Sequence, residues 1–424
     1  MPHNRPSPRV FRFCSFLAIV PFGLILASWH SKGAVRGASP SARRAASSPQ
    51  TKTGIDVLEQ QSFAPLRGKR IGLITNQTGV DSAGHRTIDV LAHAAGVQLV
   101  ALFSPEHGIR GAADEAVPNG SDPATGLPIY SLYGPTRRPA PEMLANLDAL
   151  VFDIQDAGVR FYTYVTTMGY AMEEAAKQHL SFFVLDRPDI LGGEIMEGPV
   201  LDGDKTSFVA YFPMPVRFAM TLGELAEMFN AEKRIGVHLE VIRMQEWRRR
   251  ETYGETGLAW VPPSPNLRTL RAAFLYPGIE ILQAAGVSVG RGTDSPFERF
   301  GAPWIHAETL VAELNRRKIP GVRFAPTRFT PDADLYKGQP CEGTSARVTD
   351  RESFRAMLMG LEIIEVLHRL YPQNFQIAKT IELLGSQSTV EQLTRGDEPR
   401  TILAGWAPEL DRFRSTRRNY LLYP

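Results

Sequence analysis

Acidic and polar side chains stand at the ends of four short apolar runs, where they could gather into one site. The runs are Arg70–Thr75, Gln98–Phe103, Leu150–Ile154 and Phe182–Leu185. Continuous apolar runs of this length are typical of strands buried on both faces of a parallel sheet. The carboxyl ends of parallel strands meet at one edge of the sheet, where ligands bind. Any one of these polar residues could instead cap a following helix, but together they favour a shared crevice. The residues are Asn76, Glu106, Asp153, Asp156 and Asp186.

The sharpest of these positions is Glu106, in the sequence Pro105-Glu-His-Gly108. Pro105 fixes the backbone before the glutamate, and Gly108 permits an unusual turn after it. A carboxyl held on such a turn beside an apolar strand end can have its pKa raised by loss of solvent, which suits a general acid. His107 could be a base, an orienting group or a packed ring.

A guanidinium and two phenols follow shortly after Asp153. Arg160 could bind a carboxylate carried by a sugar, with Tyr162 and Tyr164 facing the carbons of the sugar ring. An Arg–Asp ion pair packed among core aromatics would have the same composition. The residues alone therefore leave both interpretations open.

Hydrolysis of a glycosidic bond normally needs two carboxyl groups, one to protonate the leaving oxygen and one to activate water or attack the sugar. With Glu106 as the acid, we favour Asp153 as its partner over Asp156 and Glu197, because Asp153 lies at a neighbouring strand end. Assistance by an acetamido group of the substrate, or attack by Tyr162, would remove the need for a second carboxyl.

Other kinds of site lack their signatures. The first strand is followed by Asn76–Gly79, which matches neither the dinucleotide-binding glycine pattern nor a P-loop. Gly286–Gly290 matches a nucleophile-elbow pattern around Ser288, but the residues after it cannot readily open the helix that an elbow requires. The histidines lack metal-ligand spacing, and Cys341 is expected to be a packed residue. A net charge of +2 gives no support for nucleic-acid binding.

Helical patterns separate the apolar runs, so strands and helices alternate. Helices are expected over Ile88–Ala95, Thr166–Gln178 and Leu222–Glu232, and a further strand over Val237–Arg243. This order predicts an α/β domain with a Rossmann-like parallel sheet. After the proline-rich junction Val261–Asn266 the order is less regular and predicts a smaller α+β domain. Its expected elements are helices Ala307–Arg317, Arg351–Leu370 and Pro408–Tyr420 and strand Val322–Phe329.

The N-terminal 53 residues are predicted to precede the folded body. Residues 1–38 combine arginines, an apolar run and small residues, as a secretory signal peptide does, although an uncleaved membrane anchor is the alternative. Residues 39–53 are predicted to form a flexible linker. We expect a catalytic domain over residues 54–262, a C-terminal domain over residues 263–424, and an exported protein, periplasmic or extracellular.

Several longer motifs resemble the NamZ-type exo-β-N-acetylmuramidases, glycoside hydrolase family 171. They are Ser104–Gly111, Asp153–Tyr164, Asp186–Pro188, Gly198–Pro199, Met220–Ala226, Pro263–Asn266, Gly290–Thr293 and Gly301–Trp304. The resemblance implies a Rossmann-like domain joined to a second α/β domain, with the active site in the cleft between them. It also implies release of N-acetylmuramic acid from non-reducing ends of fragments such as MurNAc-GlcNAc and muropeptides, without a metal or other cofactor. The family's proposed catalytic acid falls on Glu106.

The predicted catalytic residues are thus Glu106 and Asp153. Substrate contacts are predicted for Asn76, His107, Asp156, Arg160, Tyr162, Tyr164, Asp186, Arg187, Glu197, Asn266 and Arg291. One segment departs from the family pattern, because Phe218 stands where many relatives have a histidine, which puts one substrate contact in doubt. Two alternatives remain: a muropeptide-binding protein would not need Glu106, and an esterase or deacetylase would need a serine elbow or a metal triad.

Overall fold

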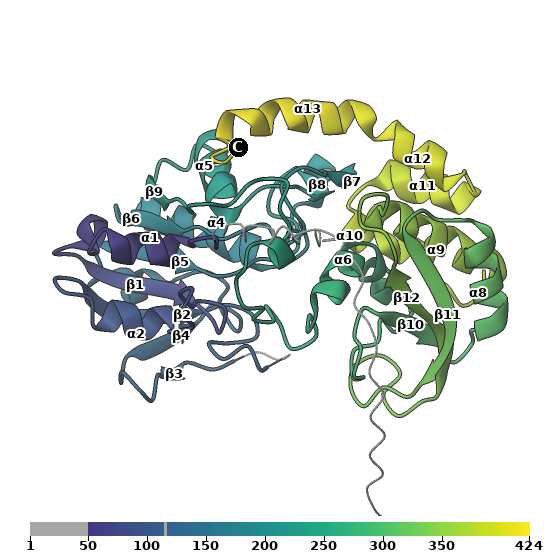
Figure 1. Cartoon of the computed structure of the whole chain (residues 1–424), viewed down its shortest axis with the longest axis horizontal. Helices are drawn as coiled ribbons and strands as arrows, with labels where there is room; N and C mark the ends of the chain where they lie inside the picture. Colours follow the sequence, from purple (N-terminus) through teal and green to yellow (C-terminus); the bar gives the residue numbers. More distant parts are fainter. Residues whose placement is uncertain (1–49, 114–116) are drawn as a thin grey trace, which may run out of the picture. The chain divides into compact units, whose positions relative to one another are not determined.

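The fold is described from a computed structural model, which covers residues 50–113 and 117–424 (Figure 1). The predicted signal peptide or anchor, residues 1–38, and residues 39–49 of the predicted linker lie outside the described residues. The amides of Thr51 and Lys52 donate to the carbonyls of Thr256 and Gln245, both at 3.0 Å. No helix in the described ranges is long and apolar enough to cross a membrane.

The first half of the chain is built on a seven-stranded sheet, which confirms the predicted parallel-sheet domain. Only the edge strand β3 runs antiparallel to its neighbour, and the other neighbouring strands are parallel. The chain order reverses between β1 and β5, the kind of point where open α/β sheets hold ligands. The spatial order is β3 (Gly120–Ser121), β4 (Pro128–Ser131), β2 (Gln98–Ser104), β1 (Arg70–Thr75), β5 (Ala149–Asp153), β6 (Ser181–Leu185) and β9 (His238–Ile242).

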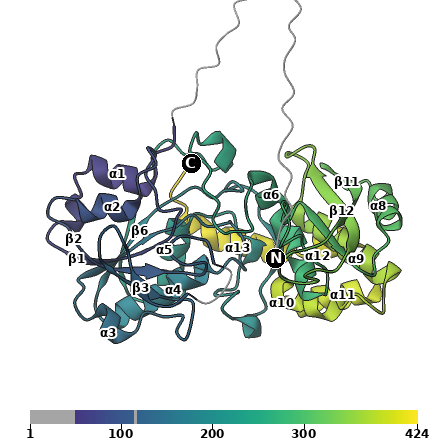
Figure 2. The same cartoon turned by 90° about the horizontal axis from the view of Figure 1, so that it is seen from below.

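Helices cover both faces of this sheet, which explains why its strands are continuous apolar runs (Figure 2). Ile71 and Leu73 of β1 face one helical layer, and Leu150 and Phe152 of β5 face the other. Successive side chains of a strand point to opposite faces, so a strand covered on both sides buries every position. The first layer holds α1 (Gly54–Gln60) and α2 (Thr87–Ala92), and the second holds α4 (Tyr164–Lys177) and α5 (Leu222–Glu232). The short α3 (Pro141–Leu144) precedes β5.

The second half of the chain has the segregated strands and helices of the predicted α+β unit. Its antiparallel sheet has the order β10 (Arg299–Ala302), β12 (Cys341–Val348), β11 (Val322–Phe329). A separate ribbon, formed by residues of the first half of the chain, pairs β7 (Glu197–Val200) with β8 (Pro215–Arg217). The helices are α6 (Leu270–Ile279), α7 (Ile281–Ala284), α8 (Ala307–Arg316), α9 (Ala356–Leu370), α10 (Ile381–Leu384), α11 (Gln387–Arg395), α12 (Pro399–Gly405) and α13 (Ala407–Arg417).

The C-terminal segment returns to the first half of the chain. α13 runs from α12 toward α5, beside which the chain ends (Figure 1). The Tyr423 hydroxyl donates to Asp186 Oδ2 at 2.6 Å, and the Leu422 amide donates to Glu224 Oε1 at 2.8 Å. Asp186 also accepts from the hydroxyl of Thr221, the N-cap of α5, at 2.7 Å. One buried carboxylate therefore ties together the end of β6, the start of α5 and the C-terminus.

Most predicted elements lie within a few residues of the observed ones. One exception is α9, which begins at Ala356 rather than at the predicted Arg351. Asp350 accepts from the Glu352 amide at 3.1 Å and folds the preceding residues into a turn. The short strands β7, β8 and β10 and the longer β12 were not predicted, because none of them is a continuous apolar run.

Replacing Tyr423 by Phe is expected to lower the free energy of unfolding by about 1–3 kcal/mol, because it removes a donor from the buried Asp186. Tyr420→Phe is the matched control: its hydroxyl bonds Glu232 at 2.7 Å in an exposed setting, and the change should stay within about 0.5 kcal/mol. Urea unfolding followed by circular dichroism measures both. Equal effects of the two variants would contradict the role of Asp186.

Candidate active site

Glu106 lies on a tight turn directly after β2. The Gly108 amide donates to the Pro105 carbonyl at 3.0 Å and closes this turn. His107 and Gly108 both have positive φ angles, 69° and 76°, a backbone conformation that residues other than glycine rarely adopt. The His107 ring is fixed through Nδ1, which lies 2.7 Å from the Ala113 carbonyl. The turn thus holds Glu106 at the strand end, where its side chain lines a cavity.

One hydroxyl group orients the Glu106 carboxyl. Thr163, at the start of α4, donates to Oε2 at 2.5 Å. The Tyr133 phenol lies near the same carboxyl. Burial, and after it the neighbouring Glu106 carboxylate, raises the pKa of Tyr133 to about 12, so this phenol stays neutral near neutral pH. A neutral hydroxyl therefore holds the carboxyl in place, with a neutral phenol nearby.

Both halves of the chain contribute to the cavity that Glu106 lines, which has a volume of about 140 Å³. The first half supplies Glu106, His107, Phe161, Tyr162, Thr163 and Val209, and the second supplies Ser264, Tyr276, Glu280, Arg291, Phe297 and Leu383. Aromatic rings, two carboxyl groups and a guanidinium thus surround one space. Of the predicted site residues, the structure brings together here Glu106, His107, Tyr162 and Arg291.

The second carboxyl group of the cavity, Glu280, was missed in the sequence. It stands between α6 and α7 and pairs with Arg291, whose guanidinium donates to Oε1 at 2.7 Å. Glu280 Oε2 is buried and has no hydrogen-bond partner among the described residues. Burial raises the pKa of Glu280, and the ion pair with Arg291 opposes this rise. The available signal was an acidic residue inside the apolar run Ala272–Leu282, since a buried charge needs a partner or a function.

Tyrosine rings form an apolar wall of the cavity. The Tyr162 ring meets those of Tyr164 and Tyr276 edge to face, with centroid distances of 4.9 and 5.9 Å. Burial raises the pKa of Tyr162 and that of Tyr276 above the usual value of a phenol. A phenol that resists ionisation is a poor nucleophile, so attack on a sugar by Tyr162 is disfavoured. The rings instead offer apolar faces to the carbons of a sugar.

Asp153, predicted to be the second catalytic carboxyl, lies instead in a buried ion pair. Arg187 donates through Nε and Nη2 to the two Asp153 oxygens at 2.6 and 2.9 Å, and the Thr87 hydroxyl donates to Oδ2 at 2.5 Å. Asp153 has no exposed surface and does not line the cavity. The strand ends do meet, but their polar side chains form hydrogen bonds and ion pairs within the protein there. This geometry supports a structural ion pair, and the predicted roles of Asp153 in catalysis and of Arg187 in substrate binding stay predictions without support from it.

Arg160, predicted to bind a substrate carboxylate, also has only structural partners. Nη1 donates to the carbonyls of Pro199 and Met214 at 3.0 and 2.7 Å, and Nη2 donates to those of Leu383 and Leu384 at 2.8 and 2.7 Å. The residue is 1% exposed, and burial lowers its pKa to about 9. Because Leu383 lines the cavity, the bonds of Arg160 position the cavity wall, and its contact with substrate stays a prediction.

Several other residues with predicted substrate contacts are likewise buried and bonded within the protein, and their contacts with substrate stay predictions. Asp186 holds the C-terminus, as described above. The rest have these partners: Asn76 Oδ1 accepts from Thr78, Tyr164 donates to the Pro263 carbonyl at 2.7 Å, and Glu197 pairs with Arg217 at 3.0 Å and accepts from the Met357 amide. Asn266 is buried as well and does not line the cavity.

Asp156 and Asp189 form a second pair of buried carboxyl groups, outside the Glu106 cavity. Both line a space of about 10 Å³, which suits one water molecule. Each has one oxygen without a hydrogen-bond partner among the described residues. Burial raises the pKa of Asp156 to about 8, with a further contribution from Asp189, and burial raises the pKa of Asp189 to about 7. The predicted substrate contact of Asp156 is therefore corrected to a largely protonated core group.

The remaining features singled out in the sequence lie away from the cavity. Phe218, at the position that departs from the family pattern, is buried in the hydrophobic core. Ser288 is buried, bonds to the Gly290 amide at 3.3 Å and is followed by no helix before β10. Burial raises the pKa of Cys341 to about 11. Within residues 50–113 and 117–424, no three His, Cys, Asp or Glu side chains are placed to hold a metal ion.

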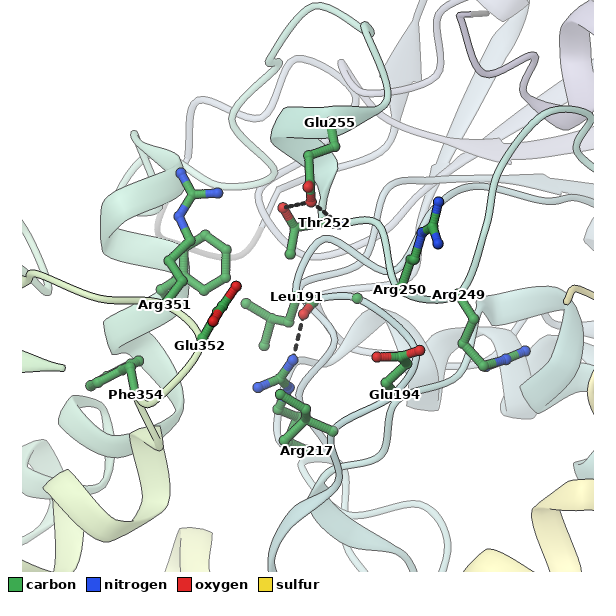
Figure 3. Close-up of a pocket in the computed structure, with 13 residues that line it drawn as sticks. Leu191, Glu194, Arg217, Arg249, Arg250, Thr252, Glu255, Arg351, Glu352 and Phe354 are labelled. Atoms are coloured by element: carbon green, nitrogen blue, oxygen red, sulfur yellow. Dashed lines mark hydrogen bonds between the residues drawn. The ribbon is translucent and has the colours of Figure 1, made fainter. Parts of the chain in front are cut away.

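A larger pocket, of about 450 Å³, lies elsewhere and contains none of the predicted site residues (Figure 3). Figure 3 shows Arg351 and Glu352 on one side of it and Arg249, Arg250 and Glu194 on the other. The buried guanidinium of Arg249 is already paired with Glu224, and that of Arg217 with Glu197. The carboxyl groups that line this pocket, those of Glu194, Glu255 and Glu352, are exposed, whereas Glu106 and Glu280 are half-buried. The cavity of Glu106 and Glu280 is therefore the candidate active site.

Two family models cover most of the chain. The one described as "Exo-beta-N-acetylmuramidase NamZ, N-terminal" matches residues 71–271, and the one described as "Exo-beta-N-acetylmuramidase NamZ, C-terminal" matches residues 274–423. The cavity draws its lining residues from both matched regions.

Characterised and solved relatives match over nearly their whole length. The peptidoglycan beta-N-acetylmuramidase NamZ of Bacillus subtilis (strain 168) is 41% identical over 417 residues, which is 97% of this chain and 99% of that protein. Two crystal structures of DUF1343 family proteins from Bacteroides fragilis NCTC 9343 superpose with TM-scores of 0.82 and 0.71, at 40% and 29% identity. Each alignment covers 88% of this chain and 99% of the solved one.

Replacing Asp156 by Asn is expected to flatten the pH dependence of stability. The raised pKa means that the protonated form is favoured on folding, so this stability is present below about pH 4 and is lost as the pH rises toward 8. The free energy of unfolding of the wild type should therefore fall more between pH 4 and 8 than that of the variant, by at least about 1.4 kcal/mol, the equivalent of one pKa unit. Parallel slopes for both proteins would contradict the assignment. Asp204→Asn, at a side chain that is 74% exposed, is the control and should leave the slope unchanged.

Proposed function

The chain belongs to the NamZ family of exo-β-N-acetylmuramidases, and we propose that it releases N-acetylmuramic acid from the non-reducing ends of peptidoglycan fragments. The observation that carries this proposal is the presence of two carboxyl groups, Glu106 and Glu280, in the lining of one cavity. Most glycosidases work with such a pair. The proposed substrates are the disaccharide MurNAc-GlcNAc and muropeptides that end in the same sugar.

In the proposed reaction Glu106 is the general acid. It transfers its proton to the oxygen between the two sugars as the bond from that oxygen to C1 breaks, and the leaving sugar departs with a free hydroxyl. Glu280 acts at C1 from the other side, as a base that takes a proton from the attacking water or as a nucleophile that bonds to C1 before water replaces it. Either route consumes one water. In the nucleophile route Glu106 takes a proton from that water as it attacks C1, which restores both carboxyl groups; in the base route Glu280 ends protonated and Glu106 ionised, and proton exchange with solvent restores them.

The surroundings of the two carboxyl groups support this division of roles. Arg291 pairs with Glu280 at 2.7 Å and favours its ionised form, which a base or nucleophile needs. Glu106 has no cation paired with it among the described residues, and its hydrogen-bond donor is the neutral hydroxyl of Thr163 at 2.5 Å. Different environments for two carboxyl groups are how glycosidases separate an acid from a base.

The size of the cavity supports cleavage from the end of a chain. Its volume of about 140 Å³ is below the range of about 300–1,000 Å³ that is usual for ligand pockets. Such a space suits one terminal sugar rather than a continuous glycan. The tyrosine wall supplies apolar contact for that sugar, and Arg291 lies beside it, where a contact with substrate stays a prediction.

We further propose that the enzyme is exported and that residues 1–38 direct this step. The support is the composition of that segment, with arginines before an apolar run and small residues after it. Expression of the full chain in a Gram-negative host, with fractionation and mass spectrometry, is expected to yield periplasmic protein that starts near residue 39. A chain that begins at residue 50 should remain in the cytoplasm. Full-length protein held in the membrane would indicate the uncleaved anchor, and cytoplasmic full-length protein would contradict export.

The roles of the two carboxyl groups predict different responses to the leaving group. Glu106→Gln should lower kcat/KM for MurNAc-GlcNAc by about 10²–10⁴-fold, the usual contribution of a general acid. With 4-nitrophenyl N-acetylmuramide the loss should be much smaller, because that leaving group needs no proton. Glu280→Gln should lower kcat/KM by a similar factor for both substrates. Release of N-acetylmuramic acid by mass spectrometry and of nitrophenol by absorbance measures these effects.

Glu142→Gln serves as the control, since this glutamate is exposed on α3. Release unaffected by Glu106→Gln would remove the acid role from Glu106. If Glu106→Gln lowers kcat/KM for the nitrophenyl substrate as much as for the disaccharide, Glu106 does not act as an acid. Binding without turnover in the wild type would favour the muropeptide-binding alternative. The anomer first released, read by proton NMR, tells whether Glu280 acts as a base or as a nucleophile.

A further inference from the structure

One arginine near the candidate active site carries a charge that no other described residue neutralises. Arg137 is exposed and lies in the loop between β4 and α3. No carboxylate among the described residues lies within ion-pair distance of it. Its guanidinium carbon instead lies 4.1 Å from the centre of the Phe208 ring and 5.9 Å from that of the Tyr133 ring. Stacking on a ring orients a guanidinium while leaving its N–H groups available to a ligand.

The loop that carries Arg137 is anchored on both sides of it. The Tyr133 amide donates to the Ser131 hydroxyl, at the end of β4, at 3.2 Å. Arg138 is fixed to α4 by ion pairs with Glu173 and Glu174 at 2.7 and 3.0 Å. An arginine held between two such anchors loses little freedom when it binds a ligand, and preorganisation of this kind favours binding.

The partner of Arg137 in the stack precedes a residue that lines the cavity. Phe208 lies in a tight turn in which Ser207 and Ala210 exchange backbone hydrogen bonds of 3.0 and 3.1 Å. The next residue of this turn, Val209, lines the cavity that holds Glu106. Through Tyr133 on one side and Val209 on the other, Arg137 therefore stands at the border of the candidate active site.

The charges of the cavity explain why a cation is needed there. Its guanidinium, Arg291, pairs with Glu280 at 2.7 Å and lies 3.7 Å from Asp334. These two carboxylates outweigh its charge, and Glu106 adds a further acidic group. N-acetylmuramic acid itself bears a carboxyl group on its lactyl ether, which is an anion at neutral pH. A cavity of this composition repels that anion unless an uncompensated cation stands beside it.

We propose that Arg137 binds the lactyl carboxylate of the terminal sugar and sets the preference for N-acetylmuramic acid, an inference that rests on the proposed function. The guanidinium meets the carboxylate at the edge of the cavity, while Glu106 and Glu280 act on C1 inside it. Arg137 is thus a specificity residue and takes no part in breaking the bond. A stem peptide offers carboxylates too, but it converts the lactyl carboxyl into an uncharged amide, so the two sources can be separated.

The test compares three substrates: the MurNAc-GlcNAc disaccharide, its primary lactyl amide, and the disaccharide with a stem peptide. For the free acid, Arg137→Gln is expected to raise KM about 10-fold to 100-fold, as loss of a hydrogen bond to a charged group does. kcat should change little, because the catalytic carboxyl groups are intact. For the amide, the wild type and the variant should have similar KM values. Arg137→Lys, which keeps the charge, should fall between the wild type and Arg137→Gln.

Arg347→Gln is the matched control, since it removes the same charge from an exposed position on β12. Because Arg137 is exposed, its effect should also fade as salt rises from about 0.01 M to about 1 M, over which the screening length shrinks from about 30 Å to about 3 Å. The KM of Arg137→Gln should lack this dependence.

Three results would overturn the proposal. Equal losses for the acid and the amide would give Arg137 a structural role only. An effect confined to the stem-bearing substrate would assign the carboxylate to the peptide instead of the sugar. An unchanged KM for the acid would exclude Arg137 from recognition. If the wild type fails to cleave the free disaccharide at all, the proposed function itself is wrong, and this outcome is distinct from the other three.

Discussion

The buried guanidinium of Arg160 is the interaction on which the arrangement of the candidate active site depends. Its four bonds reach the carbonyls of Pro199 and Met214, around the β7–β8 ribbon, and those of Leu383 and Leu384 in α10. Segments about two hundred residues apart are thereby held by one side chain. Removing it would leave four carbonyls short of a donor in a buried place, where each unsatisfied group costs about 1–3 kcal/mol. These bonds fix the position of Leu383 and with it one wall of the cavity.

The sequence was sufficient to predict the sheet and the position of Glu106. Strands β1, β2, β5 and β6 are covered on both faces by helices, so their continuous apolar runs are visible without any structure. Glu106 could be singled out because Pro105 and Gly108 flank it, and the structure shows the tight turn that these residues permit. In each case the signal is local, because a few neighbouring residues are enough to determine the conformation.

The rest of the site could not be predicted because the same residue types serve two purposes. An arginine followed by aromatic residues is consistent with a carboxylate site and with a buried crosslink, and Arg160 proved to be the second. Asp153 looked like a catalytic group until its three donors, two from Arg187 and one from Thr87, were visible. Those partners lie 34 and 66 residues away in the chain. Glu280, by contrast, was overlooked as a site residue. It lies in an apolar run, in the half of the chain whose pattern of elements was less regular.

What separates a structural carboxyl from a catalytic one here is whether its oxygens are already satisfied. Asp153 and Asp186 accept several bonds each and are closed to solvent. Glu106 and Glu280 line open space, and they come from opposite halves of the chain. Retaining and inverting glycosidases differ by only a few ångströms in the separation of their carboxyl groups. Because one half supplies the acid and the other its partner, that separation is set by how firmly the halves are joined. The buried bonds of Arg160 and the C-terminal segment held by Asp186 therefore stabilise the fold and also set the separation of the two carboxyl groups that the reaction needs.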